Sequence, residues 1–177
     1  SAKAWKANES ANLPKFYLNL KSYKKSLLNN SNPFTPSVNL MFALDEALKM
    51  MKEEGLENIF QKHERHKLAI SEAAKKLNLK LFAHEKSLSP SITAIEAQNF
   101  DAESFRKTIQ LKYGIQLAGG QDHLKGKIFR VGHLGYINDL DIISVITAIG
   151  LTLYEKNIIN QNDIGQALIE AKKHLES

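Results

Sequence analysis

The chain of 177 residues carries 24 basic and 19 acidic side chains, a formal net charge of +5, and no cysteine. This length suits one ordinary domain, or a small domain with an appended arm, and suffices to bury a core without covalent cross-links. The lack of cysteine excludes disulfides, zinc–thiolate sites and a cysteine nucleophile, and no apolar run reaches the ~20 residues of a membrane-spanning helix.

The excess positive charge is confined to residues 1–30. This segment holds six lysines and one acidic residue, Glu9, whereas residues 31–177 carry eighteen charges of each sign. A basic arm can bind phosphates, but it can equally be a surface whose acidic neighbours lie elsewhere in the protein. Because no other nucleic-acid motif is present, we expect no nucleic-acid partner. Because no apolar run is long enough to span a membrane, we expect no membrane partner either, and a cytoplasmic protein is the default.

Residues 1–36 have the composition of an arm that packs on something else. Aromatic residues lie among Lys and Asn, and residues 29–33 form a clear loop signal. Short helices are expected near residues 2–8 and 19–28, without a core of their own.

Residues 37–177 show the regular patterns of a folded domain. The apolar spacing predicts helices over 37–54, 56–78, 101–113, 139–155 and 163–175. Alternating or β-rich segments predict strands over 79–83, 91–97, 115–118 and 127–134. Asp101 is a candidate N-cap, as are Asn138 or Asp139, and Gly114 a candidate terminator. This order predicts an α+β fold, a mainly antiparallel sheet of about four strands with helices packed on one face.

Histidines offer little evidence for a metal site. His63 and His66 lie three residues apart on one expected helix and could in principle share a metal ion. Because Lys62, Arg65 and Lys67 surround them, we expect a solvated helix face instead. His133 follows a strand glycine, and we expect a hydrogen-bonded structural histidine there.

Arg130 lies in the apolar strand Ile-Phe-Arg-Val-Gly. Alternation places Phe129 and Val131 on one face of the sheet and Arg130 on the other. A guanidinium among such neighbours needs a planar anionic partner. An internal ion pair or an edge strand with its charge in solvent is the alternative.

The Gly119-Gly120 turn and Thr35 are two further candidate positions. The Gly119-Gly120 turn lets the backbone approach either a neighbouring element or a ligand closely. Thr35, between Phe34 and Pro36, would on composition alone be an ordinary helix N-cap.

Four stretches, residues 32–48, 53–58, 113–121 and 124–135, together resemble the C-terminal part of class V pyridoxal-phosphate-dependent aminotransferases of the alanine–glyoxylate and serine–glyoxylate group. The most specific of them contains Lys-Gly-Lys-Ile-Phe-Arg-Val-Gly-His-Leu-Gly. The resemblance implies a homodimeric fold-type-I enzyme, in which a small C-terminal α+β domain accompanies a large domain that binds pyridoxal 5'-phosphate. Residues 1–36 would then be an arm, formed by the tail of the large domain and an interdomain or dimer segment, and 37–177 the C-terminal small domain.

The resemblance implies a role in the active site for two residues of this chain. Arg130 matches an arginine that binds the substrate carboxylate, and Thr35 matches a threonine that contacts the cofactor phosphate of the other subunit. The family often has a tyrosine three residues before this threonine, where the present sequence has Asn32. That second phosphate contact is therefore expected to be weakened, replaced or differently placed.

The Schiff-base lysine of the family lies upstream of Trp5, and no lysine of this chain occupies its motif. We therefore expect a C-terminal fragment, with no catalytic residue of its own and inactive alone. The whole enzyme would transfer an amino group from a small amino acid, serine or alanine, to glyoxylate or a similar 2-oxo acid. The alternative is a non-catalytic dimerisation or regulatory module of the same fold.

Overall fold

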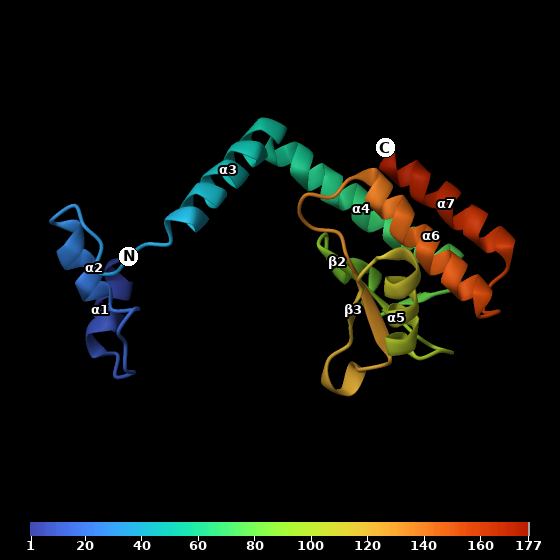
Figure 1. The fold of residues 1–177 in the computed structure, drawn as a ribbon, viewed down its shortest axis with the longest axis horizontal. Coiled ribbons are helices and arrows are strands. Elements are labelled where there is room, and N and C mark those ends of the chain that lie inside the picture. The colour runs from blue at the N-terminus through green and yellow to red at the C-terminus, as the bar shows by residue number, and fades with distance from the viewer. Residues whose placement is uncertain (177) are drawn as a thin grey trace. The chain divides into compact units, whose positions relative to one another are not determined.

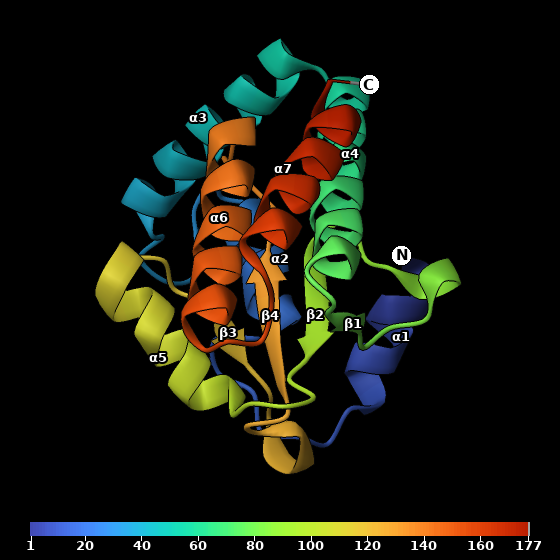
Figure 2. The same ribbon diagram turned by 90° about the vertical axis from the view of Figure 1, so that its right-hand side faces the viewer.

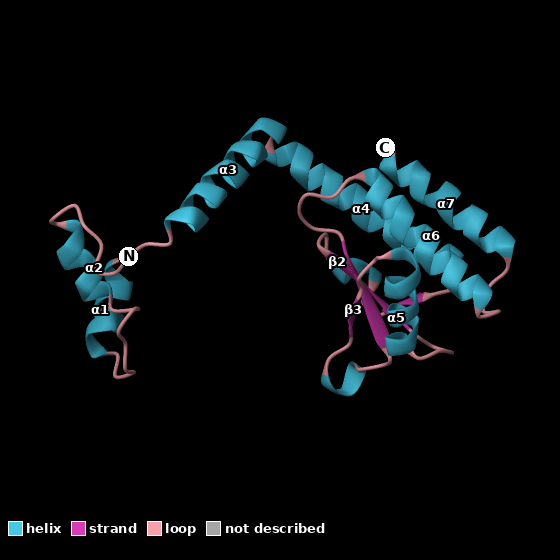
Figure 3. Ribbon diagram, viewed as in Figure 1, coloured by secondary structure: helices cyan, strands magenta, loops and turns pink. Residues whose placement is uncertain are grey.

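The computed structural model describes residues 1–176. By their contacts these residues divide into two compact units, Ser1–Glu53 and the residues from Glu54 onward. Figure 1 labels the helices and strands along the chain, and Figure 3 shows that helices account for most of the regular structure.

Three helices make up the first unit. They are α1 (Ala2–Ser10), α2 (Leu20–Leu27) and α3 (Val38–Glu54). The side chain of Ser1 caps α1 and that of Asn19 caps α2. No residue in this unit is buried, so its helices lack a core, as the sequence predicts for residues 1–36.

The contact boundary at Glu53 lies beyond residue 36, where the composition of the sequence places the end of the arm. The physical reason is that α3 has regular apolar spacing but buries none of its side chains. Its large exposed side chains include Val38, Leu40, Met41, Phe42, Leu44, Leu48, Met50 and Met51. The assignment of residues 1–36 and 37–177 to different domains of a larger enzyme stays a prediction.

The second unit combines four helices with one four-stranded sheet. The helices are α4 (Leu56–Lys76), α5 (Ala102–Tyr113), α6 (Asp139–Glu155) and α7 (Gln161–Leu175). The strands are β1 (Lys80–Leu81), β2 (Ile92–Glu96), β3 (Ala118–Gly119) and β4 (Ile128–Gly132). Two single 3-10 turns cover Glu85–Ser87 and Asp122–Leu124.

All strand pairs are antiparallel, in the order β1-β2-β4-β3. β4 is therefore an interior strand, in which Arg130 faces Ala94 of β2 on one side and Ala118 of β3 on the other. Figure 2 shows α4, α5, α6 and α7 on one side of this sheet. The α+β architecture expected from the sequence is confirmed.

The core lies between these helices and the sheet. Phe105 of α5 stacks at 5.1 Å from Phe129 of β4 and at 4.7 Å from Phe100, measured between ring centroids. Phe105 and Phe129 are completely buried, and each buried ring of this size stabilises the fold by about 2–3 kcal/mol. Within residues 1–176, none of the helices is both long and apolar enough to cross a lipid bilayer.

Local signals fix the ends of several helices. The Asp101 carboxylate accepts a hydrogen bond from the Ser104 amide, and Gly114 ends α5 in the left-handed region at φ +69°. Asn138 caps α6 and forms a reciprocal capping box with Asp141. These observations confirm the predicted caps, because short polar side chains satisfy the free amides of a first helical turn.

The prediction for the α4 histidines is wrong. His63 is 7% exposed and His66 is fully buried, whereas the sequence suggested a solvated helix face. Lys62, Arg65 and Lys67 beside them are only partly buried. His66 instead meets Asp139 at the start of α6, 73 residues later in the chain.

Candidate functional site

Arg130 lies on the interior strand β4, on the face of the sheet opposite the helices. Its strand neighbours Phe129 and Val131 are buried in the core, with 0% and 2% of their surface exposed, while Arg130 is half-buried. This is the alternation predicted from the sequence. The alternative of an edge strand is wrong, because β2 and β3 flank β4.

The guanidinium of Arg130 is held in place but not neutralised. Its Nε–H donates to the carbonyl oxygen of Gly119 at 3.0 Å. Among residues 1–176 it has no ion pair, and its two terminal NH₂ groups have no hydrogen-bond partner. A carbonyl oxygen orients the group without compensating its charge, so the terminal fork remains available for a planar anion such as a carboxylate.

The two glycines of the preceding turn are needed by the fold. A Cβ atom at Gly119 would lie 2.5 Å from Nη1 of Arg106, and one at Gly120 would lie 2.0 Å from the carbonyl oxygen of Leu124. Arg106 is itself fixed by an ion pair with Glu103 at 2.8 Å. Close approach to a neighbouring element, one of the two explanations left open for this turn, is confirmed.

Thr35 lies in a hollow of about 690 Å³ in the first unit. The hollow is lined by Tyr17, Ser31, Asn32, Pro33, Phe34, Thr35 and Pro36. The side chain of Thr35 is exposed and, within the described part of the chain, its hydroxyl has no hydrogen-bond partner. Thr35 is not the N-cap of α3, because this helix begins only at Val38 and its first turn bonds to Ser37.

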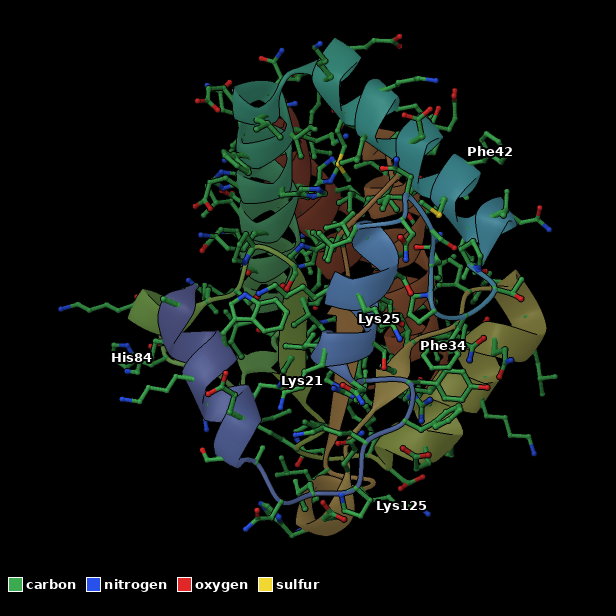
Figure 4. The ribbon with its side chains drawn as sticks, turned by 90° about the vertical axis from the view of Figure 1, so that its left-hand side faces the viewer. Lys21, Lys25, Phe34, Phe42, His84 and Lys125 are labelled. Carbon is green, nitrogen blue, oxygen red and sulfur yellow. The ribbon has the colours of Figure 1, made fainter. Side chains whose placement is uncertain are left out.

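Phe34 and Tyr17, which line this hollow, belong to an aromatic cluster. The ring of Phe34 lies 4.6 Å from that of Tyr17, 5.1 Å from that of Phe16 and 6.2 Å from that of Tyr23. Figure 4 shows Phe34 on the loop that follows α2. The sequence pattern does not predict that Tyr17 lines the hollow, because 17 positions separate it from Phe34.

The first unit also carries the positive charge found in the sequence. Lys21 and Lys25 project from α2 (Figure 4), and the ammonium of Lys24 lies 5.3 Å from the ring of Trp5. With six lysines against one acidic residue in residues 1–30, the potential around this unit favours anions. The hydroxyl groups of the hollow therefore lie on a positively charged unit.

A buried polar cluster joins α4 to the end of β4 and the start of α6. His63 donates from Nδ1 to the carbonyl oxygen of His133 at 3.0 Å, and His66 donates from Nε2 to the Asp139 carboxylate at 2.8 Å. Nε2 of His133 lies 2.9 Å from the hydroxyl of Thr93. The described residues contain no group of three or more His, Cys, Asp or Glu side chains that could hold a metal ion.

Burial dominates the protonation of His133 and His66. Together with a smaller effect of the nearby His66 and His63, burial lowers the pKa of His133 to about 4. Burial also lowers the pKa of His66, although the hydrogen bond to Asp139 opposes this shift. Both imidazoles are therefore neutral at pH 7, which suits a structural cluster.

Comparison with known proteins places these residues in a wider context. No protein-family model matches the chain. It is 51% identical over 162 residues to the soluble hydrogenase 42 kDa subunit of Anabaena cylindrica. These aligned residues cover 92% of this chain and 42% of that protein. It is 37% identical to an uncharacterised aminotransferase of Methanocaldococcus jannaschii, with 88% and 41% covered. It is 32% identical to the serine–glyoxylate aminotransferase of Methylorubrum extorquens, and the alignment covers 89% of this chain and 41% of that protein.

Solved structures of aminotransferases also resemble this chain. The ureidoglycine–glyoxylate aminotransferase of Bacillus subtilis superposes with a TM-score of 0.86 at 26% identity, covering 97% of this chain and 45% of that one. The pyridoxamine–pyruvate aminotransferase of Mesorhizobium loti gives a TM-score of 0.88 at 25% identity, covering 99% and 46%. The chain thus spans about two-fifths of the length of the curated relatives it matches.

Proposed function

Several relatives of this chain are aminotransferases, and from this premise we propose that the chain is the C-terminal part of a class V aminotransferase and supplies its substrate-carboxylate arginine and a cofactor-phosphate threonine. The whole protein then moves an amino group between a small amino acid and a 2-oxo acid. The observation that carries the proposal is the uncompensated guanidinium of Arg130 on an interior strand.

Arg130 binds and orients the amino acid in this proposal. The Gly119 carbonyl fixes the Nε edge of the guanidinium, so that both terminal nitrogens point their N–H groups at one ligand. A bidentate pair with the α-carboxylate determines which way the Cα–H bond faces. Lysine at this position would keep the charge but lose the fork.

The side chains of the hollow fit the phosphate of pyridoxal 5'-phosphate. The free hydroxyls of Thr35 and Tyr17 are hydrogen-bond donors on a positively charged unit, and Thr35 would contact the cofactor phosphate of the other subunit. When bound, this cofactor supplies an electron sink for proton transfer at the amino-acid Cα. Its Schiff-base lysine belongs, in this proposal, to the upstream part of the whole enzyme.

The names of several relatives favour a glyoxylate acceptor. Serine–glyoxylate, L-aspartate–glyoxylate and (S)-ureidoglycine–glyoxylate enzymes all match the chain at 30–34% identity. We therefore propose glyoxylate or a similar small 2-oxo acid as acceptor, and serine or alanine as donor.

Assembly into a homodimer in the cytoplasm is part of the proposal. The exposed apolar side chains of α3 support the dimer, because a continuous apolar helix face needs a covering surface. On this account the 177 residues alone are inactive, since they form only one part of the active site. The same apolar face also suits the alternative, a non-catalytic dimerisation module.

The name of the Anabaena relative provides a second candidate, a subunit of a hydrogenase. We favour the aminotransferase, because Arg130 and the Thr35 hollow suit a carboxylate and a phosphate, and both groups occur in amino-group transfer.

The proposal is tested by assaying the full-length protein loaded with pyridoxal phosphate. Serine and alanine are offered with glyoxylate, and hydrogen-dependent reduction of a redox dye is measured in parallel. Formation of glycine with matching loss of donor supports the aminotransferase. Dye reduction without amino-group transfer would support the hydrogenase subunit and contradict our proposal.

A further inference from the structure

We propose that Tyr17 is a phosphate-binding residue that acts beside Thr35 in the hollow of the first unit. The inference rests on the proposed function, since the phosphate is that of the cofactor. It assigns a role to a residue that was not identified in the sequence as part of a site.

Tyr17 lies on the segment between α1 and α2, yet it lines the same hollow as Thr35. Its ring packs against Phe34 at 4.6 Å and against Phe16 at 5.2 Å in an edge-to-face arrangement. These contacts restrict the ring, so its hydroxyl needs little further ordering when an anion binds.

Tyr17 is 65% exposed, and in the described residues no side-chain or backbone group bonds to its oxygen. A phenol is a good donor to an oxyanion, and such a charge-assisted hydrogen bond is stronger than one to a neutral acceptor. The positive charge of residues 1–30 favours a phosphate at this place.

Asn32 stands where the family resemblance implies a second phosphate contact. The sequence alone does not determine whether this contact is weakened, replaced or differently placed. Asn32 lines the hollow with a short amide side chain, while Tyr17 brings a phenol to the same hollow from another segment. Replacement by Tyr17 therefore supplies the missing hydroxyl.

The test compares Tyr17→Phe with Tyr23→Phe in the full-length protein. Both variants lose only a hydroxyl, and both rings contact Phe34, but Tyr23 does not line the hollow. Dissociation constants are measured without substrate for pyridoxal 5'-phosphate and for pyridoxal, which lacks the phosphate. We expect Tyr17→Phe to weaken pyridoxal-phosphate binding about tenfold, as for loss of one hydrogen bond to a charged group. Pyridoxal binding should not change, and Tyr23→Phe should bind both compounds like the wild type.

Some results would contradict only the role of Tyr17, and another would contradict the proposed function itself. If Tyr17→Phe binds pyridoxal phosphate like the wild type while Thr35→Ala binds it more weakly, the role of Tyr17 is overturned and the proposed function stands. Equal weakening for both compounds would also overturn it, because the hydroxyl then acts on the fold. A wild-type protein that binds the phosphorylated and unphosphorylated compounds equally well contradicts the proposed function itself.

Discussion

The imidazole of His133 lies 2.9 Å from the hydroxyl of Thr93, and both side chains are buried. Thr93 is on β2 and pairs with Val131 of β4, so this hydrogen bond ties the two strands together just beyond the end of β4. The backbone amide of His133 also donates to Ser91 at 3.0 Å. The structural role predicted for this histidine is thus confirmed, and it anchors the strand that carries Arg130.

Acidification should destabilise the second unit. The pKa of His133 is about 4 in the folded state and 6.5 in the unfolded chain, so the unfolded state binds more protons between these values. Stability is therefore fully present above pH 6.5 and falls as the pH drops towards 4, by about 3 kcal/mol from this residue. Urea unfolding at a series of pH values measures the loss.

The matched variants are His133→Gln and His123→Gln. Gln at position 133 cannot titrate, so the variant should be less stable at pH 7 but lose less stability between pH 6.5 and 4. His123 is exposed, and its replacement should leave the profile unchanged. A wild-type profile that is flat over this range would contradict the buried neutral state of His133.

Substitution at Gly120 should strain the turn before β4. The added methyl group of Gly120→Ala would lie 2.0 Å from a backbone oxygen, which cannot move aside as a flexible side chain could. We expect a loss of about 3 kcal/mol in the free energy of unfolding, at the upper end of overpacking effects. Thermal unfolding at neutral pH measures this change.

Gly165→Ala is the control for that experiment. Gly165 lies in α7, and an added Cβ there meets nothing within 4 Å. Since alanine favours a helix interior over glycine, this variant should be about 0.5–1 kcal/mol more stable. Equal stability of the two variants would show that the close approach at Gly120 is unimportant.

Much of the fold was predictable from local sequence signals. Asp101, Gly114 and Asn138 set helix ends through their own side chains or backbone freedom, and the structure has these ends where the sequence places them. β3 was predicted over 115–118 but pairs only at Ala118 and Gly119. Its position depends on the close approach of Gly119 to Arg106 in α5, which local patterns cannot reveal.

The candidate site was predictable to a smaller extent. Alternation along β4 was enough to single out Arg130, but the absence of an ion pair among the described residues required the fold. The burial of His66 depends on Asp139, and the hollow around Thr35 depends on Tyr17. Both partners are remote in sequence, so residue spacing carries no signal for them.

Thr35→Ala should weaken retention of the cofactor more than binding of the amino acid. The variant removes a free hydroxyl from the hollow and leaves Arg130 unchanged. We expect about a tenfold rise in the dissociation constant for pyridoxal phosphate in the full-length protein. Dialysis followed by absorbance titration measures it. Thr35→Ser keeps the hydroxyl and should restore most of the affinity, while equal affinity of wild type and Thr35→Ala would contradict the assignment.

The most direct test of the account compares Arg130→Ala with Lys125→Ala in the full-length enzyme. Both changes remove one positive charge from the β3–β4 region, but the exposed Lys125 has no part in the proposed site. The account predicts that Arg130→Ala lowers kcat/KM for the amino donor by a factor of about 10–100, with a raised KM, as for loss of a charged hydrogen-bonded pair. Lys125→Ala should keep the wild-type values. Unchanged kinetics in Arg130→Ala would contradict the claim that this guanidinium binds the substrate carboxylate.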